Sequence, residues 1–505
     1  FVNPKITSII PASGTVGANI AVSGNGYKPG VGDIEILLGN NSRKDNITCG
    51  SNGTFTGVFT IDTQAYGTTT VEARNQGTYQ YVKAQGTISI GAKIYAVSPF
   101  SGTVGSTVTI SGNGFTANSP GSITFGPGNS FRGNFPSNTT VSGTFISIIF
   151  TVDAQAFGTT TVTATAGDAV GTGSFKIMAN IRPLQPTIGT VGSWVTINGF
   201  GFIQGAVSIA FGGTSMPGTN ANPNGTFSTS FTVPPTPGTT AVVQATRNES
   251  TGTDTYTVIP RIYSVNPSQG SIGTLITVKG DGLGANDNVT VNFGAVVASS
   301  TTASSKGTWT CVFTAPAQAY GTTTITASGA TQTTGAYVGT FSVQAFIYEV
   351  SPTTGTIGTS ITVKGSGFNA NTTGTVTVGV EDRGTFITLA AGTFTSIFTV
   401  DSHVYGSNTV TATDVNSVSY AKSEGFIMQP LIKVLPTDGY VGDTITVSGE
   451  GFGNAETIAI HFGTIKTIAT CTTGANGAFS KIFTVAEQPA TITITAIGTT
   501  TNAST

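Results

Sequence analysis

Residues 94–115 read Ile-Tyr-Ala-Val-Ser-Pro-Phe-Ser-Gly-Thr-Val-Gly-Ser-Thr-Val-Thr-Ile-Ser-Gly-Asn-Gly-Phe, and the central phrase Pro-x-x-Gly-x-Val/Ile-Gly occurs six times in the chain. The phrase begins at Pro11, Pro99, Pro186, Pro267, Pro352 and Pro436. These prolines are 88, 87, 81, 85 and 84 residues apart. A nearly constant period of this length indicates one domain copied in tandem. We therefore divide the chain into repeats 1 to 6, at residues 1–92, 93–179, 180–259, 260–345, 346–430 and 431–505.

The residues that follow the phrase predict a β-strand and a tight turn. Val108 and Ile110 alternate with threonines, which makes one face of the strand apolar. The strand ends in Gly112-Asn113-Gly114-Phe115. Glycine allows the positive φ of a tight turn, and we expect the aromatic ring to close the end of the core.

Two further patterns predict later strands in each repeat. One is an apolar residue before glycine, such as Phe125-Gly126, and the other is Gly-Thr-Phe or a close variant. Most repeats place a second aromatic residue four positions after the first, which puts both rings on one face. In repeat 2 the spacing from Phe145 to Phe150 is five, which predicts a β-bulge. Short strands with turn signals at this spacing indicate a β-sandwich.

The combined pattern Ile-x-x-[apolar]-x-Pro-x-x-Gly-x-Val-Gly-x-x-Val-x-Ile-x-Gly-x-Gly-Phe, followed by Phe-Gly, resembles the IPT/TIG domain. All six repeats match, although Leu283 replaces the aromatic residue, Val378 replaces the phenylalanine before glycine, and repeat 6 is one residue short before Pro436. The resemblance implies an immunoglobulin-like early-set fold, and long tandem arrays of this kind resemble prokaryotic cell-surface proteins. We predict an all-β chain of six tandem immunoglobulin-like β-sandwiches in an extended rod.

Composition excludes several classes of function. Charged residues make up 8% of the chain and the net charge is −2, against roughly 25% charged residues in an ordinary domain. The chain therefore has no basic field for nucleic acid. It also has no run of the roughly 18 apolar residues that a membrane span needs. Because a surface with few charges provides little repulsion between molecules, we expect copies of the same chain, covalent glycans, or both to cover it.

Residues suited to catalysis or metal binding are sparse and scattered. Cys49, Cys311 and Cys471 fall in three different repeats, so no repeat can form its own disulfide, and the histidines are His403 and His461 alone. We predict a protein that is not an enzyme and has no cofactor or metal site. The acidic residues nearest to a calcium-like cluster are interpreted as solvated turn residues: Asp281, Asp287, Asp438, Asp443 and Glu450.

The two ends of the chain suggest how it assembles. Repeat 6 has its fifth predicted strand at 491–496 and then nine residues, so its closing strand is predicted to be missing. The start, residues 1–6, resembles the join at 426–432 and looks like the tail of a closing strand. The predicted assembly residues are Phe1, Val2, Asn3, Pro4, Lys5, Ile492, Ile494 and Ile497.

Three interpretations of these ends stay open. The chain is a window of a longer array, or residues 498–505 form a poor closing strand of their own. Alternatively, the open edge of repeat 6 accepts the N-terminal segment of the next molecule by strand addition. Because that contact joins different surfaces, it propagates into a filament.

Asn-x-Ser/Thr sequons mark candidate N-glycosylation sites. They occur at Asn40, Asn46, Asn52, Asn138, Asn224, Asn248, Asn288, Asn371 and Asn502. The functional hypothesis is a structural subunit of an extracellular filament or surface lattice at the cell surface. The alternative is the stalk of a cell-surface adhesin or a glycan-binding surface protein. A glycan-binding module would need exposed tryptophans, and of Trp194 and Trp309 the latter occupies a predicted core position.

Overall fold

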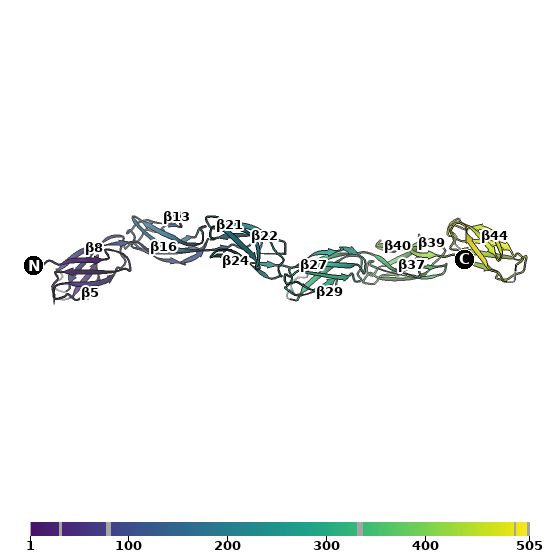
Figure 1. Cartoon of the computed structure of the whole chain (residues 1–505), viewed down its shortest axis with the longest axis horizontal. Coiled ribbons are helices and arrows are strands. Elements are labelled where there is room, and N and C mark those ends of the chain that lie inside the picture. The colour runs from purple at the N-terminus through teal and green to yellow at the C-terminus, as the bar shows by residue number, and fades with distance from the viewer. Residues whose placement is uncertain (1, 30–32, 77–81, 331–336, 489–490, 502–505) are drawn as a thin grey trace. The chain divides into compact units, whose positions relative to one another are not determined.

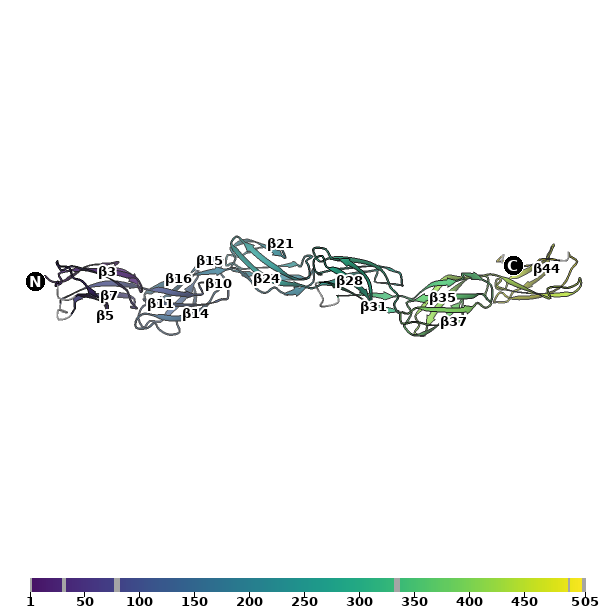
Figure 2. The ribbon, with the colours of Figure 1, turned by 90° about the horizontal axis from the view of Figure 1, so that it is seen from below.

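The structure, a computed structural model, describes residues 2–29, 33–76, 82–330, 337–488 and 491–501. Within these ranges the chain forms strands and turns without a helix, and so it contains no helix that could span a membrane. It divides into two compact units. Unit 1 comprises residues 1–234 with 240–257, and unit 2 comprises 235–239 with 258–505. Within each unit the repeats are separate pairs of β-sheets (Figure 1; Figure 2).

Repeat 2 shows the topology of a complete repeat. Its strands are β9 (Lys93–Ser98), β10 (Ser101–Thr103), β11 (Thr107–Asn113), β12 (Gly121–Phe125), β13 (Ser130–Asn134), β14 (Phe145–Thr151), β15 (Gly158–Ala166) and β16 (Ala169–Met178). One sheet has three strands in the order β14-β11-β9, and the other has five in the order β10-β16-β15-β12-β13. The phrase at Pro99 therefore lies between strands of opposite sheets. The closing strand β16 pairs antiparallel with β15 and parallel with the short β10.

Repeats 1, 3, 4 and 5 have the same two sheets. Repeat 1 contains β1 (Lys5–Ile10), β2 (Ser13–Thr15), β3 (Asn19–Asn25), β4 (Ile34–Leu38), β5 (Asn41–Ile47), β6 (Phe55–Thr60), β7 (Gly67–Asn75) and β8 (Lys83–Gly91). Repeat 3 contains β17 (Asn180–Ile181), β18 (Ile188–Gly189), β19 (Trp194–Phe200), β20 (Gly205–Phe211), β21 (Thr214–Ala221), β22 (Phe227–Thr232), β23 (Thr240–Arg247) and β24 (Ser250–Val258).

Unit 2 continues the pattern and then departs from it. Repeat 4 contains β25 (Arg261–Asn266), β26 (Gln269–Gly270), β27 (Leu275–Asp281), β28 (Asn288–Phe293), β29 (Val296–Thr302), β30 (Trp309–Thr314), β31 (Gly321–Gly329) and β32 (Tyr337–Val343). Repeat 5 contains β33 (Phe346–Ser351), β34 (Thr354–Gly355), β35 (Ser360–Ser366), β36 (Thr373–Val378), β37 (Glu381–Ile387), β38 (Phe394–Thr399), β39 (Gly406–Asp414) and β40 (Ser419–Met428). Repeat 6 has only β41 (Leu431–Leu435), β42 (Thr444–Glu450), β43 (Thr457–Phe462), β44 (Ile465–Thr472), β45 (Phe479–Thr484) and β46 (Ile494–Gly498) among its described residues.

The predicted turn and core residues take the expected positions. The second glycine of Gly-x-Gly has positive φ in all six repeats, for example +71° at Gly114. The residue that follows is 0–3% exposed: Tyr27, Phe115, Phe202, Leu283, Phe368 and Phe452. In the five repeats where this residue is aromatic, its ring meets the first aromatic of the Gly-Thr-Phe strand edge-on, as Phe115 meets Phe145 with ring centroids 5.1 Å apart. The bulge predicted in β14 is confirmed, because the register shifts between Ile110 and Gly112, and Ser147 has φ +57°.

Consecutive repeats are joined almost without a linker. One or two residues separate each closing strand from the next first strand, for example Gln429 and Pro430 between β40 and β41. A backbone hydrogen bond repeats at each joint, from the loop before the penultimate strand of one repeat to the core-closing residue of the next. In unit 1 these bonds are Tyr66 N–H to Phe115 O and Phe157 N–H to Phe202 O; in unit 2 they are Gly238 to Leu283, Tyr320 to Phe368 and Tyr405 to Phe452.

Three of the Gly-Thr-Phe glycines, Gly225, Gly307 and Gly392, also belong to joints between repeats. A Cβ built on Gly392 would lie 2.8 Å from Ala319 Cα of the preceding repeat. Gly225 and Gly307 are equally close to Ala156 and Pro237. Gly53 in repeat 1 has the same positive φ but meets only its own repeat, at Tyr27. These glycines therefore allow two backbones to approach, in addition to forming a turn.

The pair Gly392→Ala and Gly53→Ala tests this role. Each substitution places a side chain at positive φ, which costs about 1–2 kcal/mol, and only Gly392→Ala should also disturb a joint. We expect the Tyr320 amide, which bonds Phe368 O, to exchange at least about tenfold faster in Gly392→Ala than in Gly53→Ala. Hydrogen exchange measures this difference. Equal exchange at Tyr320 in both variants would show that the glycine does not support the joint.

Candidate functional site: the open edge of repeat 6

The last strand of repeat 6 has one neighbour where its counterparts have two. In repeat 5, β39 pairs with β36 on one side and with the closing strand β40 on the other. In repeat 6, β46 pairs with β43, from Ile458↔Gly498 to Phe462↔Ile494. The sheet has the order β44-β43-β46, so within the described ranges no strand pairs with the outer side of β46. We call this side, Ile494–Gly498, the open edge. The last described strand ends at Gly498 and not at Ala496 as predicted, and a missing closing strand in repeat 6 stays a prediction.

The open edge leaves the repeat 6 core unfilled. In repeats 2 to 5 the closing strand buries an aromatic ring that is 0–1% exposed: Phe175, Tyr256, Phe341 and Phe426. Two residues later it buries an aliphatic side chain that is at most 3% exposed: Ile177, Val258, Val343 and Met428. In repeat 6 a groove of about 350 Å³ is open instead. Its walls include Val434, Ile445, Phe462, Val485 and Ile494.

The segment after Pro436 also differs from its counterparts in the other repeats, because no closing strand lies beside it within the described residues. In repeat 5 the short strand β34 pairs in parallel with the closing strand β40. The corresponding residues of repeat 6, 438 and 439, form no strand in the structure. Val441 is 65% exposed, whereas its counterpart Val191 is 8% exposed. A strand seated in the groove would therefore be flanked by β46 on one side and by this segment on the other.

A buried carboxylate closes the end of repeat 6 next to the open edge. Glu456 is 2% exposed, and it accepts hydrogen bonds from the backbone N–H groups of Gly453, Thr500 and Thr501, at 2.8, 2.8 and 2.5 Å. Burial raises the pKa of Glu456, but the bonds from Thr501, Thr500 and Gly453 more than offset this, so the pKa lies below its ordinary value. The residues that follow β46 are thus held against the sandwich by an ionised side chain.

Repeat 6 should lose stability in acid through Glu456. Because the folded pKa is lower than the unfolded one, this stabilisation is complete above the unfolded value, about 4.3, and is lost as the pH falls through the folded pKa. Glu456→Gln should cost about 1–3 kcal/mol at neutral pH and reduce the acid dependence. Hydrogen exchange of repeat 6 amides between neutral and acid pH measures both effects. The exposed Glu249→Gln is the control, and an identical acid profile in the two variants would contradict the assignment.

Only some of the predicted assembly residues are available for assembly. Ile492 and Ile494 line the groove. Ile497 belongs to the open edge, but strand alternation places its side chain on the opposite face of β46 from Ile494. The prediction of Lys5 as part of a free donor strand is corrected, because Lys5 belongs to β1 and pairs with Asn25 of repeat 1. The assembly role of the isoleucines stays a prediction. Phe1 lies outside the described residues.

The start of the chain has the register of a joint between repeats. Asn3 O and Pro4 Cα lie against Gly26, as Gln429 O and Pro430 Cα lie against Gly451. Pro4 is therefore already in contact with repeat 1, which corrects its assignment to a free donor strand. By this register Val2 corresponds to Met428, the last core residue of a closing strand. Val2 is 80% exposed.

Eight of the nine sequon asparagines lie on the exposed surface, in turns or at the ends and edges of strands. They are Asn40, Asn46, Asn52, Asn138, Asn224, Asn248, Asn288 and Asn371. Asn502 lies outside the described residues. Glycosylation of these residues stays a prediction.

The polar residues considered for chemistry have structural roles. The interpretation of Asp281 and Asp287 as solvated turn residues is wrong, because their side chains are buried, at 4% and 5% exposed. Asp281 pairs with Arg261, and Asp287 accepts the Gly284 N–H group. His403 is held by Val378 O at 2.6 Å from its Nε2. All three cysteines are free thiols, and within the described residues no cluster could hold a metal ion.

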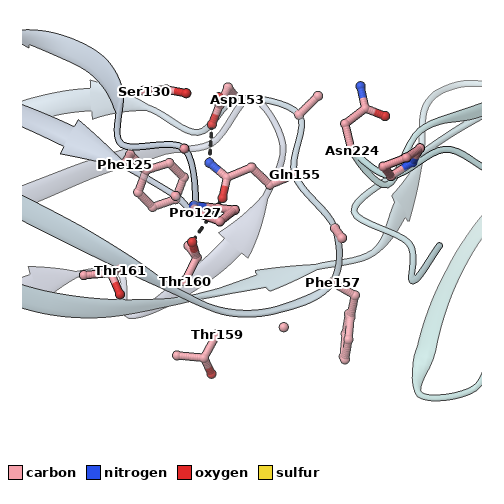
Figure 3. Close-up of a pocket in the computed structure, with 16 residues that line it drawn as sticks. Phe125, Pro127, Ser130, Asp153, Gln155, Phe157, Thr159, Thr160, Thr161 and Asn224 are labelled. Atoms are coloured by element: carbon pink, nitrogen blue, oxygen red, sulfur yellow. Dashed lines mark hydrogen bonds between the residues drawn. The ribbon is translucent and has the colours of Figure 1, made fainter.

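A second hollow, of about 600 Å³, lies at the end of repeat 2 and is lined also by Pro223 and Asn224 of repeat 3 (Figure 3). Gln155 Nε2 donates to Asp153 Oδ1 at 2.6 Å, and Thr160 Oγ1 donates to Gln155 Oε1 at 3.1 Å. Asp153 also pairs with Arg132. These groups satisfy one another and no histidine, cysteine or lysine is among the lining residues, so we place the candidate site at the open edge.

Comparisons with known proteins agree with the repeats. A family model described as the IPT/TIG domain matches residues 260–343 and 345–425, in repeats 4 and 5. A comparison with curated proteins found no match.

A comparison with solved structures found similar chains at low sequence identity. They include the N-terminal eight Ig domains of Down syndrome cell adhesion molecule, with 11% identity, 99% of this chain and 72% of that chain covered, and a TM-score of 0.18. A tetra-tandem repeat from the extending region of a large adhesion protein has 16% identity, 68% and 98% coverage, and a TM-score of 0.19. A Ca²⁺-stabilised adhesin of an Antarctic bacterium has 15% identity, 68% and 99% coverage, and a TM-score of 0.14.

Proposed function

The chain contains two tandem IPT/TIG domains, and from this premise we propose that it is a non-enzymatic structural subunit of an extracellular filament or surface lattice. Copies join head to tail when the N-terminal segment of the next copy adds to the open edge of repeat 6 as a β-strand. The observation that carries the proposal is the three-stranded sheet β44-β43-β46, where the other repeats have five strands. We place the protein at the cell surface.

The N-terminal segment supports the proposal through its register. Val2 corresponds to Met428, and Asn3 and Pro4 lie on Gly26 as Gln429 and Pro430 lie on Gly451. A donor that places Val2 over repeat 6 would therefore build a joint like those between repeats within the chain. Since Asn3 and Pro4 lie against Gly26 and Lys5 belongs to β1, Phe1 and Val2 are the donor residues of this segment.

Two general features favour self-association of this kind. An unpaired strand edge presents free backbone N–H and C=O groups, and a strand from a second copy can satisfy them. The chain also has 8% charged residues, so electrostatic repulsion between copies is weak. A contact between the last repeat of one copy and the first residues of the next does not close on itself, and it therefore produces an open chain of subunits.

Val2→Asp tests the assembly. A carboxylate at the position of a buried aliphatic residue should prevent insertion, because an unpaired buried charge is unfavourable. We expect the natural chain to form fibres or sheets in negative-stain electron microscopy, and Val2→Asp to remain a single-copy species in analytical ultracentrifugation. Val415→Asp is the matched control, because Val415 is 67% exposed on a turn of repeat 5. Monodisperse particles of the natural chain, or unchanged assembly of Val2→Asp, would contradict the proposal.

The alternative function is the stalk of an adhesin or a glycan-binding surface protein. Trp194 favours glycan binding, because its ring is 68% exposed on β19, whereas Trp309 is 4% exposed in the core of repeat 4. An exposed aromatic face can bind the apolar face of a sugar ring. This alternative needs no contact between copies, so the assembly test distinguishes it from the lead proposal.

We also propose that N-glycans cover part of the surface. The sequon asparagines Asn52 and Asn224 are exposed in the turns before Gly-Thr-Phe strands. Glycopeptide mass spectrometry of protein from its native source should find glycans on several of the eight exposed asparagines. Asn75, which is 0% exposed and lies outside any sequon, is the internal control. Unmodified peptides for all eight asparagines would exclude this proposal.

A further inference from the structure

We infer that the open edge of repeat 6 selects a β-strand with an aromatic residue followed, two positions later, by an aliphatic residue. The strand runs antiparallel to β46. This inference rests on the proposed function, because it specifies the chemistry of the strand that completes repeat 6, and by the register given above Val2 of the N-terminal segment takes the aliphatic position. It identifies the occupant from repeats 2 to 5 of the same chain, in which an aromatic and an aliphatic side chain fill the equivalent groove, whereas Ile88 and Ile90 fill it in repeat 1.

The ring contacts of repeat 6 indicate the aromatic residue. In repeats 2, 3 and 4 the phenylalanine at the end of the third long strand touches two rings, one of them from the closing strand. The closing-strand contacts are Phe125–Phe175, Phe211–Tyr256 and Phe293–Phe341, with centroids 5.9, 5.6 and 5.6 Å apart. Phe462 is the equivalent ring of repeat 6. It meets Phe483 at 5.5 Å, and its other side faces the groove.

The strand register gives the position of that aromatic residue. Phe462 pairs with Ile494 as Phe125 pairs with Val162. Two residues before Val162, Thr160 lies opposite Phe175. The same relation places Ala241 opposite Tyr256, Thr323 opposite Phe341 and Asn408 opposite Phe426. The donor's aromatic residue should therefore lie opposite Ile492, with its ring against Phe462.

The other wall of the groove adds a charge preference. In repeat 2, Ser101 on the short parallel strand lies opposite Lys176 of the closing strand, between Phe175 and Ile177. The residue of repeat 6 at the position of Ser101 is Asp438, which lines the groove. A donor with lysine between its aromatic and aliphatic residues would place opposite charges on neighbouring strands. Among the closing strands of this chain, residues 170–179 fit this pattern best, because they contain Phe175-Lys176-Ile177.

A peptide with the sequence of residues 170–179 tests the inference on the monomeric full chain carrying Val2→Asp. We expect saturable binding in fluorescence anisotropy, and slower hydrogen exchange of the β46 amides when the peptide is bound. Replacing the peptide's phenylalanine by serine should weaken binding at least tenfold, because the ring is lost from an apolar groove. A peptide of the same composition in scrambled order is the negative control.

Phe462→Leu in the chain separates the ring contact from general apolar burial. An edge-to-face ring pair contributes about 0.5–1.5 kcal/mol beyond burial, equivalent to about two- to tenfold in affinity. With Phe462 present, the natural peptide should bind better than a variant with leucine at the aromatic position. In Phe462→Leu most of this preference should disappear. Retention of the repeat 6 exchange pattern in Phe462→Leu shows that the variant is folded.

The outcomes separate this inference from the proposed function. If the peptide does not bind, if the serine variant binds equally well, or if β46 is already protected in the monomer, the inference is wrong even where Val2→Asp abolishes assembly. If the peptide binds with the expected preference but Val2→Asp still assembles, the inference stands and the N-terminal segment is not the donor.

Discussion

The closing strand is the element on which each sandwich depends. It satisfies the backbone edge of the strand before it and pairs with the short strand that begins two residues after the proline, and in repeats 2 to 5 it supplies a buried ring to the core. In repeat 5 these three tasks belong to β40, through Asn408↔Phe426, Thr354↔Ile427 and the 0% exposed Phe426. Truncation of a buried phenylalanine typically costs about 3–5 kcal/mol. Among the described residues of repeat 6, where no strand takes this place, three features occur together: an unpaired edge, a segment at 438–439 that forms no strand, and an open groove.

The closing strand also connects each repeat to the next. Because it passes into the following first strand after one or two residues, the strand that completes one core also positions the next repeat. The backbone bond at each joint and the glycines at Gly225, Gly307 and Gly392 hold the neighbouring repeats in contact. A strand donated between molecules would thus reproduce a connection that the chain already uses internally.

Local patterns in the sequence predicted much of this fold, and contacts between distant residues set the rest. The positive φ of Gly114 and the burial of Phe115 depend on residues next to them in the sequence, so the Gly-x-Gly-Phe motif was sufficient to predict both. The closing strands of repeats 2 to 5 were predictable because the same pattern recurs before each joint, and a missing closing strand in repeat 6 stays a prediction. The position of Lys5 in β1 and the outward direction of Ile497 depend on strand register, which apolar alternation alone left undetermined. Asp281 and Glu456 are buried because Arg261 and the backbone near Thr501 meet them, and these partners are about 20 and 45 residues away in sequence. The predicted extended rod stays a prediction.

The residues of the open edge differ from those that protect other edges of this chain. Proteins protect edge strands with charged residues or proline, which discourage pairing with other chains. The long strands at one edge of the five-stranded sheets mostly follow this rule: β5 carries Arg43 and Lys44, β13 carries Arg132, β21 carries Pro217 and β37 carries Arg383, while β29 does not follow it. The strands at the other edge, β2, β10, β18, β26 and β34, are two or three residues long and carry neither a charge nor a proline. The edge strand β44 of repeat 6 carries Lys466. By contrast, β46 reads Ile-Thr-Ala-Ile-Gly, with neither a charge nor a proline. A strand that remained exposed to solvent would be a risk for random aggregation, so its unprotected sequence favours a specific strand partner.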